Sequence, residues 1–284
     1  MKFKMLSECT IEEAVIAWNR GFEGYFVKIE MTPQSFMNRI ISEGISLDLS
    51  RVLFDENEPI AIILNGFRIT KAGKKIAWNG GTGVAPAYRG KGSSKLLMEE
   101  TMRIYHDEGV DIATLEAIKE NEKAIRLYEK YGYQITDRLV YLNGVLKQSE
   151  NTPIPIISKS IRPEQLQMIP FYNENVPWQC QWQSAKEGEA QIYHDENQSP
   201  LGYSLFRKVW NLEGKLEKVL LYQIELLNDV DEKTIYPAIL ENIAKDKSTS
   251  TTFIAINFNL ENPISQFLLE NGLHKTIEQV QMMK

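Results

Sequence analysis

The feature that most constrains this chain is a glycine-containing turn, Arg89-Gly90-Lys91-Gly92-Ser93-Ser94, which joins a strand to a helix. The run from Ile76 to Val84 indicates the strand, and apolar residues recur at helical spacing from Leu97 until the helix ends near Gly109. Glycines let successive backbone N–H groups converge, and a helix N-terminus carries partial positive charge. The turn is therefore predicted to bind a phosphate, and Arg89, Lys91 and Lys95 add positive charge in a stretch without acidic residues.

Two other phosphate-binding turns do not fit this segment. The P-loop needs a Gly-Lys pair directly before its Ser or Thr, and here Gly92 follows Lys91. The dinucleotide-binding fingerprint lacks its third glycine, and a β-meander precedes the turn where a first βαβ strand should be. A different phosphate-containing ligand is therefore expected.

The surrounding pattern predicts a mixed α/β domain. Helices are expected from Thr10 to about Tyr25, behind a capping box, and from Thr32-Pro33 to Gly44. Strands are expected at 52–54, 60–64, 76–84 and 112–118, followed by a helix that Asn121 caps and Gly132 stops, and by a closing hairpin over 133–146. The strand before the turn carries Gly80, Gly81 and Gly83, which marks either a close backbone approach or an irregular strand end.

Two segments resemble motifs of the GNAT superfamily of acyl-CoA N-acyltransferases. The stretch from Val84 to Leu97 resembles motif A, Gln/Arg-x-x-Gly-x-Gly/Ala: Arg89 and Gly92 match it, whereas Ser94 stands where glycine or alanine is preferred. The stretch from Asn121 to Tyr133 resembles the family's Asn-x-x-Ala-x-x-Leu-Tyr-x-x-x-Gly-Phe segment. The resemblance spans most of residues 1–147 and implies a mixed sheet splayed in the middle, with the pantetheine arm of acetyl-CoA between strands 76–84 and 112–118.

The resemblance also implies roles for individual residues. The residues expected to bind acetyl-CoA are Val84, Arg89, Gly90, Lys91, Gly92, Ser93, Ser94, Lys95 and Asn121. The backbone N–H of Val84 would polarise the thioester carbonyl, and Tyr128 would protonate the departing thiolate, although Tyr128 could instead be a packing residue. Glu116 is a candidate base, and its alternative is a solvated strand carboxylate.

The second half of the chain echoes the first. A proline-rich stretch at 151–155 suggests a boundary, so we expect a GNAT domain at 1–149 and a degenerate GNAT-like domain at 153–284. In this weak internal repeat, the segment from Asn257 to Gly272 corresponds to the Asn121 segment. The segment from Asn228 to Lys233 corresponds to the phosphate turn. This second segment lacks glycine and carries three carboxylates, which would repel a pyrophosphate. The second domain is expected to shape the acceptor cleft, to offer a surface for a homo-oligomer, or simply to support the first.

Composition excludes several classes of function. A net charge of −6 argues against a nucleic-acid partner, and no stretch approaches the roughly 18 apolar residues of a membrane span. The two cysteines are far apart and the three histidines are isolated, so we expect no disulfide framework and no metal, and a cytoplasmic location. An acidic surface mildly favours cationic acceptors such as polyamines or aminoglycosides.

The sequence thus predicts an N-acetyltransferase that transfers an acetyl group from acetyl-CoA to a primary amine of a small molecule or peptide. The alternative is a catalytically weak coenzyme A-binding sensor or scaffold, for which the Ser94 departure and the uncertain base are the hints.

Overall fold

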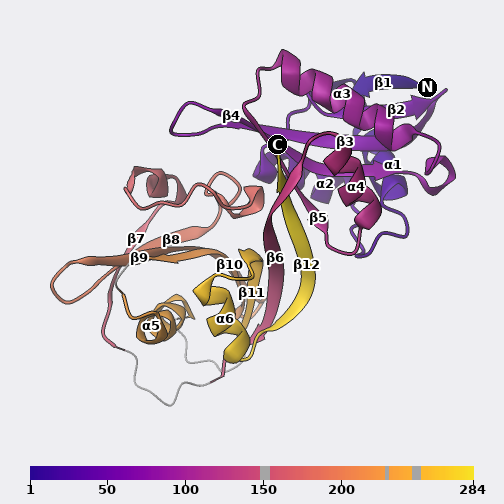
Figure 1. Cartoon of the computed structure of the whole chain (residues 1–284). Helices are drawn as coiled ribbons and strands as arrows, with labels where there is room; N and C mark the ends of the chain where they lie inside the picture. The colour runs from indigo at the N-terminus through magenta and orange to yellow at the C-terminus, as the bar shows by residue number, and fades with distance from the viewer. Residues whose placement is uncertain (148–153, 228–229, 245–250) are drawn as a thin grey trace. The chain divides into compact units, whose positions relative to one another are not determined.

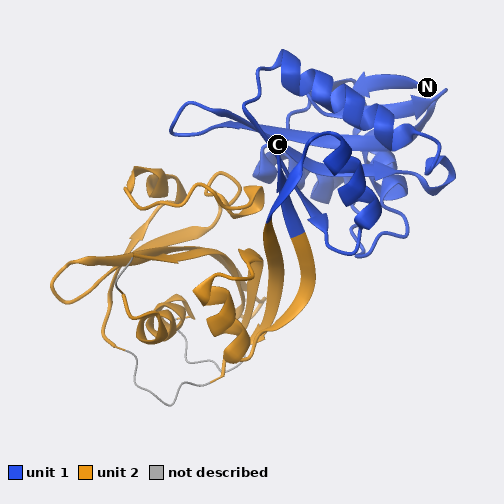
Figure 2. Cartoon of the chain, viewed as in Figure 1, with its two compact units in different colours: residues 1–136, 280–284 blue, residues 137–279 orange. Residues whose placement is uncertain are grey.

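A computed structural model describes residues 1–147, 154–227, 230–244 and 251–284 (Figure 1). It separates into two compact units, residues 1–136 with 280–284 and residues 137–279 (Figure 2). Strands β6 (Gln134–Val145) and β12 (His274–Met283) each contribute residues to both units. The predicted boundary at 149–153 lies outside the described residues, as do residues 228–229 of the loop compared with the phosphate turn.

The first unit is built on strands in the order β1-β2-β3-β4-β5, after which the C-terminal residues of β12 pair with β5. Its strands and helices are β1 (Lys2–Met5), α1 (Ile11–Gly21), α2 (Pro33–Glu43), β2 (Arg51–Asp55), β3 (Glu58–Ile69), β4 (Lys75–Val84), α3 (Ser93–Asp107), β5 (Ile112–Ile118) and α4 (Glu122–Lys130). Short 3-10 turns lie at Leu6–Glu8 and Pro86–Tyr88. The buried residues of α3 and α4 pack with alternate residues of β3 and β5, such as Ile63, Leu115 and Ala117.

The helix signals in the sequence form the predicted caps. Glu13 N–H donates to Thr10 Oγ1 at 3.1 Å, and Thr10 N–H donates to Glu13 Oε2 at 2.9 Å, which completes the capping box of α1. Gly44 ends α2 with φ 65°, in the left-handed region that glycine adopts without strain. Helix α1 ends at Gly21, four residues before the predicted end.

The sheet opens between β4 and β5, as predicted for a splayed mixed sheet. These parallel strands pair from Ile76 to Asn79 on β4 and from Ile112 to Leu115 on β5, and the register between them stops there. At the same place a bulge interrupts the β3–β4 pairing, because Leu64 pairs with Gly81 and Asn65 with Asn79. Gly80 is therefore the extra residue that bends β4 away from β5.

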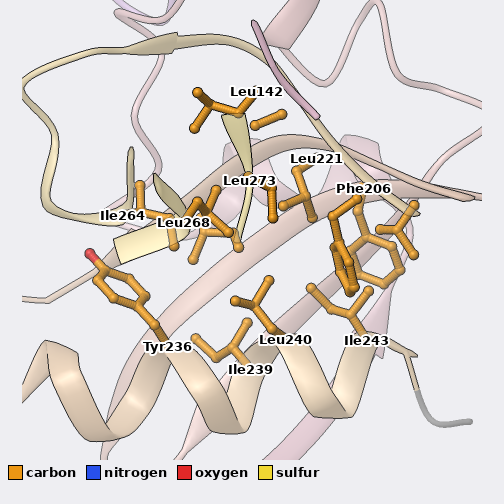
Figure 3. Close-up of a cluster of buried hydrophobic side chains, with 14 of the residues drawn as sticks. Leu142, Phe206, Leu221, Tyr236, Ile239, Leu240, Ile243, Ile264, Leu268 and Leu273 are labelled. Atoms are coloured by element: carbon orange, nitrogen blue, oxygen red, sulfur yellow. The ribbon is translucent and has the colours of Figure 1, made fainter. Parts of the chain in front are cut away.

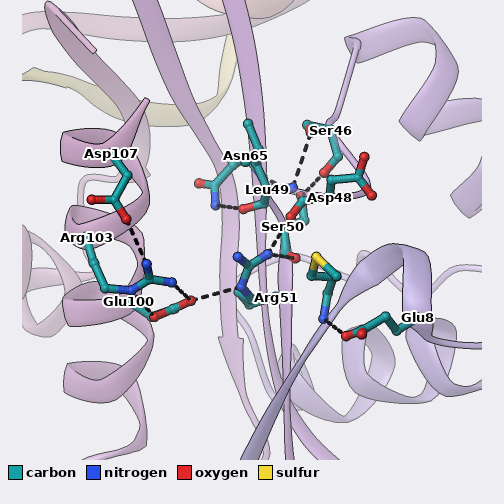
Figure 4. A network of polar contacts seen from close by, with 11 residues as sticks. Glu8, Ser46, Asp48, Leu49, Ser50, Arg51, Asn65, Glu100, Arg103 and Asp107 are labelled. Carbon is teal, nitrogen blue, oxygen red and sulfur yellow. Dashed lines mark hydrogen bonds and ion pairs between the residues drawn. The ribbon is translucent and has the colours of Figure 1, made fainter. Parts of the chain in front are cut away.

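Helix α3 is fixed to the sheet by a polar network (Figure 4). The buried Arg51 of β2 donates from Nε to Glu100 Oε1 on α3 at 3.0 Å and from Nη1 to the carbonyl of Asp48 at 2.6 Å. Arg103 on α3 also contacts Glu100, and Arg103 and then Arg51 hold the pKa of the Glu100 carboxyl below its usual value. This network sets the position of the helix whose N-terminus follows the glycine turn.

The second unit contains a sheet in the order β6-β11-β10-β9-β8-β7. Its other elements are β7 (Ile157–Ile161), the 3-10 turns η3 (Pro163–Met168) and η4 (Trp178–Cys180), β8 (Glu189–His194), β9 (Pro200–Trp210), β10 (Leu216–Leu226), α5 (Glu232–Ala244), β11 (Thr252–Asn259) and α6 (Pro263–Glu270). Helices α5 and α6 bury Ile239, Leu240 and Leu268 against Phe206 and Leu221 of the sheet (Figure 3). Again, β10 and β11 run parallel and pair only from Lys218 to Leu221 and from Thr252 to Ala255.

Three expectations about local structure were wrong or incomplete. The segment 133–146, predicted as a hairpin, contains the single strand β6 from Gln134 to Val145, within which Leu139, Val140 and Leu142 are buried. The segment from Asn257 to Gly272, compared above with the Asn121 segment, begins inside β11, and the residue in the capping position of Asn121 is Asn262, at the predicted start of the helix, with its Oδ1 accepting from Ile264 N–H at 3.2 Å. Strands β1, β7, β8 and β12 were not predicted, because they are edge strands or carry many polar residues.

Within the part of the chain that the structure describes, no helix has the length and apolar character to cross a membrane.

Candidate active site

The predicted phosphate turn leads into the N-terminus of α3 without a side-chain cap. Gly90 and Gly92 have φ of 74° and 92°, a region that favours glycine, and Gly92 occupies the cap position with no side-chain hydrogen bond. The first turn of α3 contains no acidic residue. Ser93 is 1% exposed, and among the described residues its hydroxyl has no hydrogen-bond partner. The backbone N–H groups of the first turn of α3, which no side chain caps, and the Ser93 hydroxyl are suited to bind an anion.

Arg89 has a structural task in this turn. Its Nε donates to the carbonyl of Val84 at 2.8 Å, and its Nη2 donates to the carbonyls of Gly21 and Glu23 at 3.1 and 2.6 Å. The guanidinium thus ties the end of β4 to the end of α1. In this arrangement Arg89 orders the loop, and the phosphate-facing groups would be mainly backbone.

The two lysines of this segment, Lys91 and Lys95, lie at the surface. Lys91 Nζ lies 5.9 Å from the centre of the Tyr88 ring, and Lys95 forms an exposed ion pair with Glu99 at 3.5 Å. Ser94 is half-buried in the first turn of α3. Both lysines can therefore turn toward a bound anion at little cost, because exposed ion pairs contribute little to stability.

The backbone N–H of Val84 points toward the open side of β4. Ala85 N–H donates to the carbonyl of Ile60 on β3 at 2.8 Å. Because successive N–H groups of a strand point to opposite edges, that of Val84 points away from β3, toward the edge where β5 has ceased to pair. This is the position that a donor to a thioester oxygen in the gap requires.

Aromatic side chains lie against the three glycines of β4. A Cβ atom on Gly83 would lie 2.8 Å from the Phe22 ring, and one on Gly81 would lie 3.0 Å from the Trp18 ring. A Cβ on Gly80 would meet the Trp78 ring at 2.5 Å. Aromatic side chains of α1, of the residue that follows it and of β4 therefore approach the strand closely at these glycines, and a Cβ atom would collide with them.

Tyr128 of α4 reaches the gap from the other face. It is 7% exposed and packs with Leu115 and Ala117, so it does belong to the core. Its hydroxyl nevertheless has polar partners: burial raises the pKa of Tyr128 to about 12, opposed by hydrogen bonds with the side chains of Thr82 and Asn79 on β4. A buried tyrosine whose hydroxyl is held at the strand edge can donate a proton there.

Glu116 lies on the opposite face of the sheet from Tyr128, because Leu115 and Ala117 on either side of it pack with Tyr128. Its Oε2 accepts from the indole Nε1 of the buried Trp78 at 2.7 Å. A thioester in the gap between β4 and β5 would thus be reached by an acid from one face and a carboxylate from the other.

Asn121 caps α4, with its Oδ1 accepting from Ala124 N–H at 3.3 Å. The same side chain bonds to the hydroxyl of Tyr25, whose pKa is raised by burial and lowered by this bond. Tyr25 also lies close enough to Tyr128 to affect its titration. The predicted site residues Val84, Asn121 and Tyr128 therefore gather around the end of the gap, together with Tyr25.

No sequence pattern singled out Tyr25, Trp78, Asn79 or Thr82 as site residues. Asn79 and Thr82 flank two of the glycines of β4, and polar residues inside a glycine-rich strand end were an available signal. The contribution of Tyr25 depends on the path of the loop after α1, which no local pattern reveals. That loop is held by Trp18 Nε1, which donates to the carbonyl of Ile29 at 2.8 Å.

The positions of β10 in the second unit that correspond to the glycines of β4 carry large side chains. Pairing in both units ends after four residue pairs, and the next residue of the central strand is a bulge, Gly80 in one unit and Tyr222 in the other. Counting on from the bulge, Gln223 and Glu225 occupy the places of Gly81 and Gly83. The glycines of the first unit are thus replaced by residues that fill space.

The opening between β10 and β11 is bridged by the protein's own chain. Gln223 Nε2 on β10 donates to the carbonyl of Cys180 at 2.7 Å, and Cys180 Sγ donates to the carbonyl of Ile256 on β11 at 2.9 Å. The turn η4 therefore contacts both strands. At the start of α5, Asp231 Oδ1 accepts from Lys233 N–H at 3.2 Å, so a carboxylate lies where the first unit has Gly92.

Comparisons with known proteins agree with this geometry. The model of the acetyltransferase (GNAT) family matches residues 16–133. A comparison with curated proteins gives no match. A GCN5-related N-acetyltransferase from Sphaerobacter thermophilus is similar in structure, with a TM-score of 0.65 and 13% identity over 100% of this chain and 94% of that one.

Two further solved structures cover both units. A tandem GNAT protein from the clavulanic acid biosynthesis pathway has a TM-score of 0.64 and 9% identity, over 100% of this chain and 98% of that one. A putative acetyltransferase from Pyrococcus horikoshii has a TM-score of 0.59 and 16% identity, over 100% of this chain and 88% of that one. At these identities the likeness is one of fold. The family match places residues 16–133 in the acetyltransferase (GNAT) family, and the chain as a whole has the fold of two GNAT domains in tandem.

Proposed function

We propose that the first unit transfers an acetyl group from acetyl-CoA to a primary amine of a small molecule or peptide. The observation that carries the proposal is the gap between β4 and β5, which has an uncapped helix N-terminus beyond its end and a tyrosine hydroxyl beside it. The N-terminus of α3 and the turn from Gly90 to Lys95 would hold the pyrophosphate. Arg89 orders that turn, and Asn121 contacts the cofactor arm.

The reaction requires three groups of the protein. The neutral amine attacks the thioester carbon, and the Val84 N–H donates to the oxygen that gains negative charge. As the carbon–sulfur bond breaks, Tyr128 gives its proton to the departing thiolate. Glu116 receives the proton lost by the amine, through water, from the opposite face of the sheet. Atoms and charges then balance as an amide, a free thiol and a tyrosinate–carboxylic acid pair that exchanges its proton with solvent.

The acceptor would approach from the α1 side, where aromatic rings lead from the core to the surface. Phe22 lies against Gly83, Tyr25 packs edge-on to Phe22 at 5.3 Å, and Phe26 packs on Tyr25 at 5.4 Å and is 56% exposed. Aromatic rings favour apolar carbon and tolerate an ammonium group on their faces. We therefore expect amines on aryl or alkyl groups to be better acceptors than aminoglycosides.

Release of free thiol from acetyl-CoA tests the proposed function. Purified protein is mixed with acetyl-CoA and, separately, with phenethylamine, hexylamine, spermidine, kanamycin and a free N-terminal peptide, and thiol is followed with a chromogenic disulfide. We expect amine-dependent release with at least one acceptor, and mass spectrometry should show the matching N-acetyl product. Coenzyme A binding without thiol release on any amine would instead support the sensor or scaffold.

The second unit is proposed to bind no coenzyme A. Its central strand carries Gln223 and Glu225 in place of glycines, η4 bridges the strands at the gap, and Asp231 caps the helix that would receive the pyrophosphate. A carboxylate at that place repels a pyrophosphate, and the chain already fills the place of the pantetheine arm.

Calorimetric titration of the full chain with coenzyme A should therefore give one site per chain. Asp231→Gly is a useful companion variant, because removal of one carboxylate leaves the bridge of η4 in place and should create no second site. Two sites in the unmodified protein would contradict the assignment of the second unit.

A further inference from the structure

Asn79 and Thr82 of β4 are held in an arrangement that fixes which atoms donate. Gly81 N–H donates to Asn79 Oδ1 at 3.0 Å, so this oxygen is the accepting side of the amide and Nδ2 is the donating side. Nδ2 lies 2.9 Å from Thr82 Oγ1, which therefore accepts a hydrogen bond from the amide. The hydroxyl proton of Thr82 remains for another acceptor, either Asn79 Oδ1 at 3.1 Å or the hydroxyl oxygen of Tyr128.

The bulge at Gly80 is what brings these two side chains to the same place. Residues three apart in a regular strand lie on opposite faces of the sheet. The extra residue at Gly80 shifts the alternation, so Asn79 and Thr82 bond to one another on the face of β4 that Tyr128 approaches, and both lower the pKa of the Tyr128 hydroxyl. The bulge therefore opens the gap and also builds a polar pair against the tyrosine hydroxyl.

Proton donation by Tyr128 suggests a role for Asn79 and Thr82. When Tyr128 gives up its proton in a buried site, negative charge develops on its oxygen, and burial disfavours that charge. Hydrogen-bond donors aimed at the oxygen favour the charged form. Of the groups that act on this hydroxyl, Tyr25 raises its pKa, whereas Thr82 and Asn79 lower it.

We propose that Thr82, supported by Asn79, is a positioning residue that holds the Tyr128 hydroxyl at the gap and stabilises its deprotonated form during transfer. The proposal rests on the proposed acetyl transfer, and it assigns to these residues an effect on the chemical step and not on coenzyme A binding. Thr82 acts through Tyr128 and does not itself exchange a proton with the thiol.

A double-mutant cycle with Tyr128→Phe tests this assignment. Thr82→Val keeps the shape of the side chain and removes its hydroxyl, so we expect kcat to fall about tenfold with KM for acetyl-CoA unchanged. Thr82→Ser should restore most of the loss. In the Tyr128→Phe background, Thr82→Val should cause no further loss. An equal loss in both backgrounds, or none in either, would overturn the proposal.

A matched control and a second readout separate this proposal from the proposed function. Thr114→Val removes a buried hydroxyl of the same sheet that donates to the carbonyl of Ala77 at 3.2 Å, and it should leave kcat unchanged. Replacement of Tyr128 by 3,5-difluorotyrosine allows its ionisation to be titrated spectrally without turnover. Thr82→Val should raise that pKa and Thr114→Val should not. If the wild type releases no thiol, the proposed function fails, while an unmoved titration refutes the assignment of Thr82.

Discussion

Substitution of Tyr128 by phenylalanine is expected to lower kcat for acetyl transfer by roughly 100-fold and to leave KM for acetyl-CoA almost unchanged. The ring is buried against Leu115 and Ala117, and phenylalanine keeps this packing. What is lost is the hydroxyl that Thr82 and Asn79 hold beside the gap. Without it, the thiolate must leave unprotonated or take a proton from water. Thiol release under saturating acetyl-CoA and amine measures the effect.

Tyr133→Phe is the matched control for this prediction. Tyr133 packs edge-on to Tyr128, with ring centres 6.0 Å apart, and is 1% exposed. Among the described residues its hydroxyl has no hydrogen-bond partner, so its removal should leave turnover intact and should not lower stability. Full turnover in Tyr128→Phe, or equal losses in both variants, would show that Tyr128 serves only packing.

The parts of the fold that could be predicted from the sequence are those that depend on residues close together in the chain. The capping box at Thr10, the Thr32-Pro33 start and the Gly44 stop each depend on residues within one or two turns, and the structure has all three. The bulge and the splay were indicated by Gly80 and by the resemblance to the GNAT family. Strand β6 was misjudged because its extended course depends on contacts that are distant in the sequence: a Cβ on Gly144 would meet the carbonyl of Gly272 at 2.7 Å.

The candidate site divides in the same way. Motif positions such as Gly92, Asn121 and Tyr128 could be named from the sequence, because their spacing is a property of the motif. Their partners could not, since Thr82 reaches Tyr128 only through the bulge, and Tyr25 reaches Asn121 only through the anchored loop after α1. Arg89 shows a further limit. Its charge suggested contact with a phosphate, whereas in the fold its guanidinium donates hydrogen bonds to three backbone carbonyls.

The contrast between the two helix N-termini leads to the second large effect. Gly92→Asp would place a carboxylate at the start of α3, as Asp231 does at the start of α5. The carboxylate would accept from the N–H groups that the pyrophosphate needs and would repel its charge. At about 5 Å and an effective dielectric constant near 20 the repulsion is about 3 kcal/mol, so coenzyme A should bind roughly 100-fold more weakly.

Calorimetry with coenzyme A measures this loss of affinity. Gly73→Asp is the control for the backbone strain and the added negative charge that Gly92→Asp also introduces. Gly73 has φ 78° in the β3–β4 turn with open space around it, so aspartate there brings a similar backbone strain and the same charge. Strain alone would lower the melting temperature of both variants and leave coenzyme A affinity intact in Gly73→Asp. Unchanged affinity in a folded Gly92→Asp would mean that the pyrophosphate does not lie at the N-terminus of α3, because a carboxylate at that position cannot share those N–H groups with it.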